Sequence, residues 1–189
     1  MGLGLRKIIN KGYIEYVLLN FSLRRFFLGF DNANRVLRFA DKRVVIPILR
    51  NNGARVGRGC DIETPLIIHN CVNYQNLTIG NNCHIGKDVF LDLRDRVVLE
   101  DNVTISMRTS IITHLDVGKS PLKQHGFHNE QGGVVLKRGC YIGANAVILH
   151  SVIVGECSLV GSSALVTQDV PPYTVVGGVP ADVIKPIDR

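Results

Sequence analysis

Three of the six histidines in this 189-residue chain fall in one irregular stretch. They are His114, His125 and His128, within residues 113–135. A neutral imidazole accepts a proton near pH 7, so histidine suits general base catalysis at that pH. Irregular loops on a rigid scaffold often carry functional residues, and we therefore expect the chemistry of the chain here.

The five cysteines do not favour a second kind of site. Their number is odd, no C-x-x-C pair occurs among them, and none lies within residues 113–135. The sequence predicts reduced thiols on small, mostly buried side chains, with no disulfide framework and no metal site. They are Cys60, Cys71, Cys83, Cys140 and Cys157.

The segments on both sides of this stretch repeat with a period of six, with an aliphatic residue that is often followed by Gly. After the stretch the repeat comprises Leu136, Ile142, Ile148, Val154, Val160 and Val166; before it, Ile79, Ile85 and Leu91, then, after a slip of two residues, Leu99, Ile105 and Ile111. This period suits neither an amphipathic helix nor a long alternating strand. It is typical of short strands separated by sharp corners.

The repeat predicts an all-β solenoid, in which stacked coils form parallel sheets. Three hexads in each coil make a triangular prism, with about five coils between Val56 and Val170 at this period. The aliphatic residues point inward, and Gly or Asn occupies corners where a positive φ is needed. The expected corner asparagines are Asn81, Asn82, Asn102 and Asn145. Residues 113–135 then form an excursion from one corner.

Three segments carry a resemblance to a known family. They are "ISMRTSIITH" (105–114), "GCYIGANAVIL" (139–149) and "VGSSALVTQDVPPYTVVGGVPADVIK" (160–185). Together with the hexads they resemble the left-handed β-helix hexapeptide acyltransferases, over about residues 53–187. Within that family the chain is most similar to the galactoside, maltose and Nod-factor O-acetyltransferases and to those of polysaccharide biosynthesis.

The resemblance implies transfer of an acetyl group from acetyl-CoA to a carbohydrate hydroxyl, such as that of a surface polysaccharide or a lipid-linked glycan precursor. It implies a homotrimer, with each active site between two prisms. The histidine that matches the family's general base is His114. The acceptor oxygen would then attack the thioester directly within a ternary complex. The oxyanion donor would be the backbone N–H of Ala144.

Other site residues follow from the resemblance one by one. Asp92 matches a residue that binds the acceptor's hydroxyls. Tyr141 stands where many members have Trp, near the CoA end of the cleft. Ser162 and Thr167 match positions that contact the pantetheine arm and the pyrophosphate.

The chain departs from the family pattern at two expected phosphate contacts. Gln168 stands in place of the usual Lys, and Asp182 in place of a Lys or Arg. Lys185 is then the candidate for the 3′-phosphate of CoA, with Lys137 or Arg138 as further cations. Each of these could equally be a solvated surface charge.

Residues 1–50 differ in character from residues 51–189. They hold ten Lys or Arg against three acidic residues, a net charge of +7, and seven of the twelve aromatic residues; the remainder of the chain carries −1. Ile14, Val17, Leu18 and Phe21 fall at helical spacing. Residues 1–50 are therefore predicted to be a basic amphipathic helical segment. It either caps the first coil or lies on an anionic membrane as a peripheral anchor.

Several alternatives remain open. The acceptor could be the amine of an amino sugar or a small xenobiotic alcohol, since a His base serves both nucleophiles. A γ-type carbonic anhydrase needs three converging His ligands, and no matching spacing occurs. A catalytically idle scaffold is the third class. Nucleic acid is not an expected partner, because the solenoid is slightly acidic and carries no recognised binding motif.

The same sequence bears on location. No apolar run reaches the roughly 18 residues of a transmembrane helix, and the first residues lack the layout of a signal peptide. The expectation is a cytoplasmic protein, or one held peripherally at the inner face of the membrane.

Overall fold

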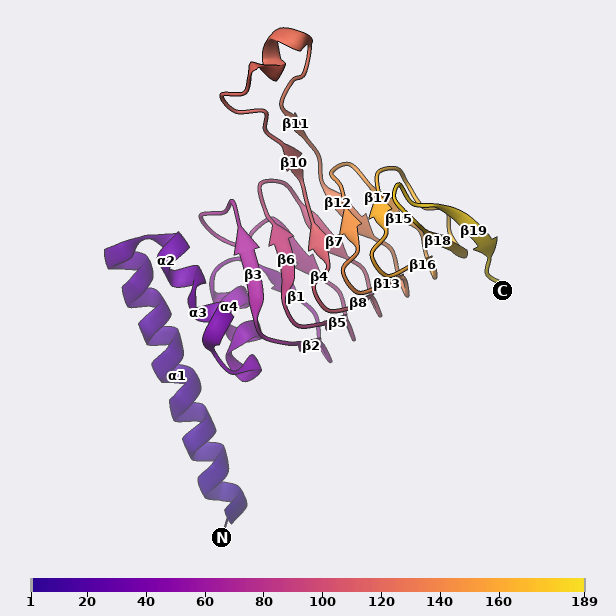
Figure 1. Ribbon diagram of the computed structural model, residues 1–189. Helices are drawn as coiled ribbons and strands as arrows, with labels where there is room; N and C mark the ends of the chain where they lie inside the picture. Colours follow the sequence, from indigo (N-terminus) through magenta and orange to yellow (C-terminus); the bar gives the residue numbers. More distant parts are fainter. Residues whose placement is uncertain (1, 189) are drawn as a thin grey trace.

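Short hexads form short strands, and the strands stack into three sheets. The computed structural model describes residues 2–188 and consists of N-terminal helices followed by a parallel β-solenoid (Figure 1). The helices are α1 (Gly2–Leu28), α2 (Phe30–Asn34), α3 (Val36–Phe39), η1 (Lys42–Val44) and α4 (Val45–Asn51). A further 3₁₀ helix, η2 (Pro121–His125), lies within the excursion.

Each turn of the solenoid passes once through each sheet. Sheet A contains β1 (Arg55–Val56), β4 (Leu77–Ile79), β7 (Val97–Leu99), β12 (Val134–Leu136) and β15 (Ile153–Val154). Sheet B contains β2 (Asp61–Ile62), β5 (His84–Ile85), β8 (Thr104–Ile105), β13 (Tyr141–Ile142), β16 (Leu159–Val160), β18 (Thr174–Gly177) and β19 (Asp182–Pro186). Sheet C contains β3 (Leu66–His69), β6 (Val89–Asp92), β9 (Ser110–Ile111), β14 (Val147–Ile148) and β17 (Leu165–Val166).

Strands pair in parallel from one coil to the next, except for the antiparallel pair of β18 and β19. Because a parallel pair needs a long crossover, each strand finds its partner one full coil later in the chain. The predicted fold, a left-handed parallel β-helix of hexapeptide repeats preceded by helices, is confirmed.

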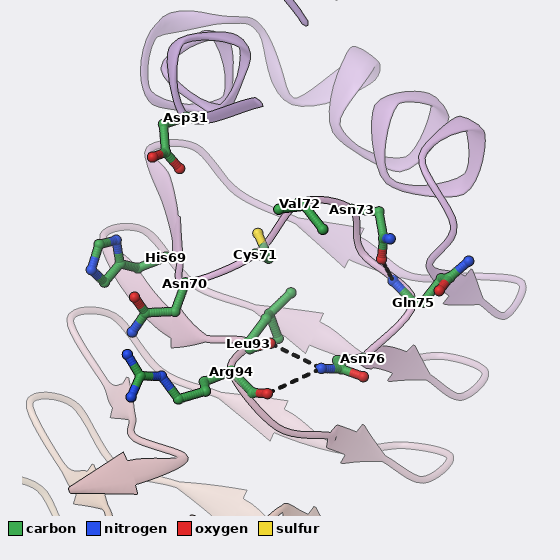
Figure 2. Close-up of a pocket in the computed structure, with 10 residues that line it drawn as sticks. All are labelled: Asp31, His69, Asn70, Cys71, Val72, Asn73, Gln75, Asn76, Leu93 and Arg94. Carbon is green, nitrogen blue, oxygen red and sulfur yellow. Dashed lines mark hydrogen bonds between the residues drawn. The ribbon is translucent and has the colours of Figure 1, made fainter. Parts of the chain in front are cut away.

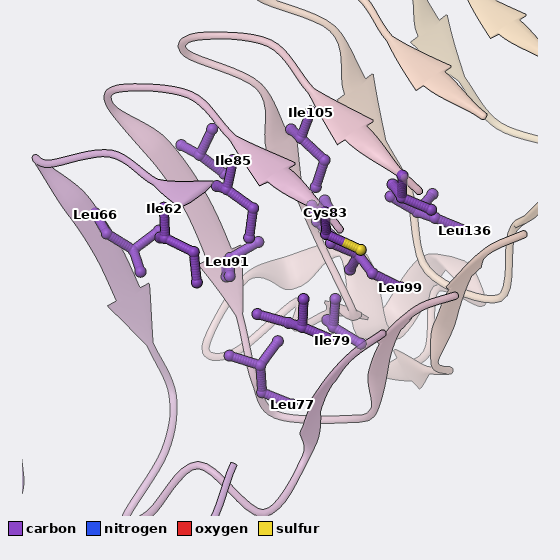
Figure 3. Packing of buried hydrophobic residues seen from close by; sticks show 14 of the residues in the cluster. Ile62, Leu66, Leu77, Ile79, Cys83, Ile85, Leu91, Leu99, Ile105 and Leu136 are labelled. Atoms are coloured by element: carbon purple, nitrogen blue, oxygen red, sulfur yellow. The ribbon is translucent and has the colours of Figure 1, made fainter. Parts of the chain in front are cut away.

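The aliphatic residues of the hexads fill the interior of the prism (Figure 3). Ile85, Leu91, Leu99, Ile105 and Leu136 are almost completely buried. Cys83 and Cys140 take interior positions as well, where a small side chain fits the narrow core.

The corners use left-handed backbone, as predicted for three of the four asparagines. Asn82, Asn102 and Asn145 have φ angles of 54°, 60° and 58°. Asn81 does not belong to this group. Its side-chain oxygen instead accepts a hydrogen bond from the backbone N–H of Arg58, which ties two coils together.

The buried hexad residues should dominate stability. Leu91→Ala is expected to lower the free energy of unfolding by about 2–5 kcal/mol, because it leaves a cavity in a close-packed core. Leu159→Ala is the matched control, since Leu159 lies on an outer face of β16 and is 36% exposed, and its cost should stay below about 1 kcal/mol. Denaturant titration of both variants measures the free energy of unfolding. An equal decrease in the two variants would contradict the packing described.

The N-terminal helices cover the first coil of the solenoid. On α1, Val17 and Phe21 are buried, and the Phe21 ring lies 6.5 Å from that of Tyr74, centroid to centroid. Ile48 and Leu49 of α4 are completely buried in the same core. Within residues 2–188, no helix combines the length and apolar character that crossing a membrane requires.

Between β9 and β12 the chain leaves the prism at the corner that joins sheet C to sheet A. The excursion begins as the antiparallel pair of β10 (His114–Leu115) and β11 (Glu130–Gln131). Residues 121–129 beyond this pair are all exposed, and Figure 1 shows them projecting from the side of the solenoid.

Candidate active site

His114 stands at the base of the excursion, as the first residue of β10. Its Nδ1 lies 2.5 Å from Oδ2 of Asp92, the last residue of β6 in the preceding coil. Its side chain is 17% exposed, and its Nε2 has no hydrogen-bond partner among residues 2–188. A carboxylate only accepts hydrogen bonds, so Nδ1 carries the proton and Nε2 presents a lone pair.

Asp92 is held from several sides. Oδ1 accepts a hydrogen bond from Asn70 Nδ2 at 2.9 Å, and Oδ2 accepts from the backbone N–H and the Oγ1 of Thr113 at 2.9 and 2.8 Å. Burial raises the pKa of the Asp92 carboxyl, but hydrogen bonds from Asn70, His114 and Thr113 outweigh it and lower the pKa to about 2. The carboxylate is therefore ionised throughout the physiological range.

This lowered pKa predicts an acid-labile contribution to stability. The folded pKa lies below the usual value of 3.8, so the contribution is complete above about pH 4 and disappears as the pH falls through about 2. Its size is about 2 kcal/mol. The free energy of unfolding, measured against pH for the wild type and Asp92→Asn, should show this loss in the wild type alone. Parallel curves would contradict it.

The geometry of Asp92 differs from the acceptor-binding role that the resemblance implies. The side chain is 1% exposed, and both of its oxygens are already bonded within the chain. In this arrangement the carboxylate contacts Asn70, Thr113 and His114.

Two residues of this network were missed from the sequence. Asn70 and Thr113 both orient Asp92, and neither stands in a recognisable motif. The strand register would have located them: β3 pairs with β6 so that His69 is opposite Asp92, and β6 pairs with β9 so that Leu91 is opposite Ile111. Asn70 and Thr113 are thus brought to the corner that carries Asp92.

A cleft of about 520 Å³ opens beside this network (Figure 2). Asn70 and Arg94 belong to its lining, and both also hydrogen-bond to Asp92, Arg94 through its backbone N–H. The rest of the lining is mostly polar and includes Asp31, His69 and Asn76. Groups of this kind can both donate and accept hydrogen bonds, as a polyhydroxylated ligand requires.

The other expected site residues lie on different parts of the prism. Ala144 and Ser162 occupy the corner between sheets B and C in consecutive coils, and the Ala144 carbonyl accepts from the backbone N–H of Ser163. Tyr141 is exposed on β13 of sheet B. His114 lies at the next corner, between sheets C and A, so the width of sheet C separates it from Ala144.

Thr167 and Lys185 lie further toward the C-terminus. Thr167 follows β17, which stacks on β14 and then on β9, so it shares the corner of His114 two coils away. Lys185 is exposed on β19, opposite Val175 of β18, at the C-terminal end of the solenoid. Neither of these residues belongs to the Asp92 network.

Cysteine and metal chemistry find little support in the described part of the chain. All five cysteines are free, and burial raises the pKa of the Cys83 and Cys140 thiols to about 11 and about 12. A protonated thiol is a poor nucleophile. Residues 2–188 contain no group of three or more His, Cys, Asp or Glu placed to hold a metal ion.

Comparison with known proteins extends these observations. Residues 133–168 match the family described as bacterial transferase hexapeptide (six repeats). The galactoside O-acetyltransferase of Escherichia coli K12 is 25% identical over 146 residues, which are 75% of this chain and 68% of that protein. A 2,3,4,5-tetrahydropyridine-2,6-dicarboxylate N-acetyltransferase of Enterococcus faecalis is 54% identical over 55 residues, but these cover 29% of this chain and only 24% of that enzyme.

Solved structures agree on the fold. A hexapeptide-repeat-containing acetyltransferase from Vibrio cholerae superposes with a TM-score of 0.72 at 21% identity, over 93% of both chains. A galactoside acetyltransferase in complex with coenzyme A gives 0.71 at 23% identity, over 90% of this chain and 82% of that one. Residues 133–168 thus match the bacterial transferase hexapeptide family, and the fold of the chain is similar to that of hexapeptide-repeat acetyltransferases.

Proposed function

We propose that this protein transfers an acetyl group from acetyl-CoA to a hydroxyl of a carbohydrate. The observation that carries the proposal is His114, whose Nδ1 is fixed on the buried Asp92 carboxylate while Nε2 is left without a partner in the described chain. The galactoside acetyltransferase and the Vibrio cholerae acetyltransferase are known in complex with coenzyme A and acetyl-CoA, respectively, which supports an acyl-CoA donor.

In the proposed mechanism Nε2 of His114 accepts the proton of the acceptor hydroxyl. The oxygen attacks the thioester carbonyl, and a tetrahedral oxyanion forms. As it collapses, the carbon–sulfur bond breaks and the CoA thiolate leaves, taking the proton back from the imidazolium. Asp92 keeps its negative charge throughout and stabilises the transient imidazolium, so it acts as a positioning residue.

The oxyanion donor supports an active site between two copies of the chain. The backbone N–H of Ala144 makes no hydrogen bond within residues 2–188, so it is free to bind an oxyanion. Within one copy of the chain, Ala144 and His114 are separated by the width of sheet C. In a homotrimer, the corner that carries His114 can face the neighbour's corner with Ala144 and Ser162. We place the pantetheine arm of CoA between these two corners, with Tyr141, Thr167 and Lys185 as further contacts.

The polar cleft beside Asp92 is the proposed acceptor site. Its amide, imidazole, carboxylate and guanidinium groups suit sugar hydroxyls, and it adjoins the carboxylate that holds His114. Transfer to an amine is the second candidate, because a segment of 55 residues is 54% identical to part of an N-acetyltransferase. The AntD N-acyltransferase of Bacillus cereus, known with dTDP and coenzyme A, shares the fold at a TM-score of 0.61.

The experiment is to measure release of the CoA thiol from acetyl-CoA against a panel of saccharides, amino sugars and glycolipids. The proposal predicts release that depends on a carbohydrate acceptor and an acetylated product that hydroxylamine cleaves, as it cleaves esters. An acetylated product that resists hydroxylamine would establish the amine as acceptor instead. Release that does not depend on any acceptor would contradict the proposal.

A further inference from the structure

One face of the N-terminal helices is apolar although it covers nothing. Exposed apolar side chains of α1 recur every three or four residues at Tyr16, Leu19, Leu23 and Phe26, with Ile9 two turns before them and Phe27 directly after. Phe26 is 81% exposed and Phe27 71%. Leu19 and Leu23 lie two residues on either side of the buried Phe21, so the 3.6-residue period directs them away from the prism. The helix therefore has two apolar faces, of which the solenoid uses one.

The second apolar face continues onto α3. Phe39, the last residue of α3, is 88% exposed. Tyr16, Arg35 and Phe39 line one groove of about 460 Å³ between α1 and α3. Arg35 and Arg38 are exposed and line an adjoining groove together with Phe39, and neither has an ion-pair partner among the described residues. We call this surface the basic-aromatic face. It consists of Tyr16, Leu19, Leu23, Phe26 and Phe27 of α1, together with Arg35, Arg38 and Phe39.

The positive charge around this face indicates what kind of partner it binds. Residues 1–50 carry a net charge of +7, so a second copy of the same face would bring like charges together. A partner that is both apolar and anionic fits, and a bilayer containing anionic phospholipid has these two properties. Aromatic side chains insert at the boundary between the lipid headgroups and the acyl chains, while Lys and Arg beside them reach the phosphates.

The position of α1 agrees with such contact. Figure 1 shows α1 at the end of the solenoid opposite the C-terminal strands β18 and β19, with the other helices between it and the coils. The basic-aromatic face is thus not covered by any other described element. We infer that it binds the surface of anionic membranes and holds the solenoid there, without spanning the bilayer.

Co-sedimentation of the full-length protein with vesicles tests this inference. We expect binding to phosphatidylcholine–phosphatidylglycerol vesicles that weakens at high salt, and much weaker binding to phosphatidylcholine alone. Phe26→Ser/Phe27→Ser should lower the partition coefficient by about tenfold or more, and Arg35→Glu/Arg38→Glu by a similar factor. The charge variant leaves the apolar core intact, so the test does not depend on the Phe variant alone.

The matched control is Leu122→Ser/Phe127→Ser, which removes the same number of exposed apolar side chains from the excursion. It should sediment like the wild type. Failure of the wild type to bind anionic vesicles would overturn the inference, as would equal losses in the control and the Phe variant. A Phe26→Ser/Phe27→Ser protein that binds vesicles normally but loses self-association in sedimentation equilibrium would assign the face to a second copy instead.

Discussion

Replacing His114 with alanine is expected to lower kcat/KM for acetyl transfer by about 10²–10⁴-fold, because the acceptor hydroxyl then has no base to take its proton. The side chain lies at the surface end of the Asp92 network and is not part of the core, so the solenoid should remain folded. Steady-state kinetics with acetyl-CoA and the best acceptor of the panel measure the effect. The loss should fall on kcat, since His114 is not placed among the residues expected to bind CoA.

His128→Ala is the matched control for His114. It is the same substitution in the same excursion, at an exposed residue with no bond to Asp92. It should change kcat/KM by less than about threefold, as for a surface substitution. If His114→Ala and His128→Ala behaved alike, a role for His114 in proton transfer would be excluded.

Asp92→Asn is expected to produce the second large loss, about 10²–10⁴-fold in kcat. Oδ2 accepts from His114 Nδ1 and twice from Thr113, and Oδ1 accepts from Asn70. An amide has one oxygen, so in either orientation the new side chain sets its NH₂ against a donor. If the NH₂ takes the place of Oδ2, the imidazole loses its orientation and the tautomer that leaves Nε2 free. If it takes the place of Oδ1, the imidazole still loses the negative charge that stabilises its protonated form.

The readout for Asp92 must separate positioning from a merely structural defect. The KM for acetyl-CoA should stay unchanged while kcat falls, and the double variant Asp92→Asn/His114→Ala should be no slower than His114→Ala. Asn70→Ala is the milder comparison, since it removes one hydrogen bond and keeps the charge. Multiplicative losses in the double variant would show that Asp92 acts independently of His114.

Much of the fold could be predicted because the hexad is a strong local signal. Few folds place an aliphatic residue at every sixth position. Ile85, Leu91 and Ile105 all point inward, as expected. The corner asparagines were harder to assign. Asn81 and Asn82 are adjacent, and only the backbone shows which of them adopts a positive φ.

The site was less accessible to sequence reasoning because its contacts cross from coil to coil. The distance between Asp92 and His114 follows from a strand register that a slip of two residues between Leu91 and Leu99 obscures. The burial of Asp92 could not be read from the sequence either, since a carboxylate at a corner is usually solvated. In this chain Asn70 and Thr113 hydrogen-bond to the Asp92 carboxylate, and these bonds support the proposal that Asp92 positions His114.

The most direct measurement is mass spectrometry of the acceptor after incubation with isotopically labelled acetyl-CoA and either the wild type or His114→Ala. The account predicts that the wild type places the labelled acetyl group on the carbohydrate, in step with CoA thiol release, and that His114→Ala yields almost none under the same conditions. An equal yield of labelled product from the two proteins would contradict it.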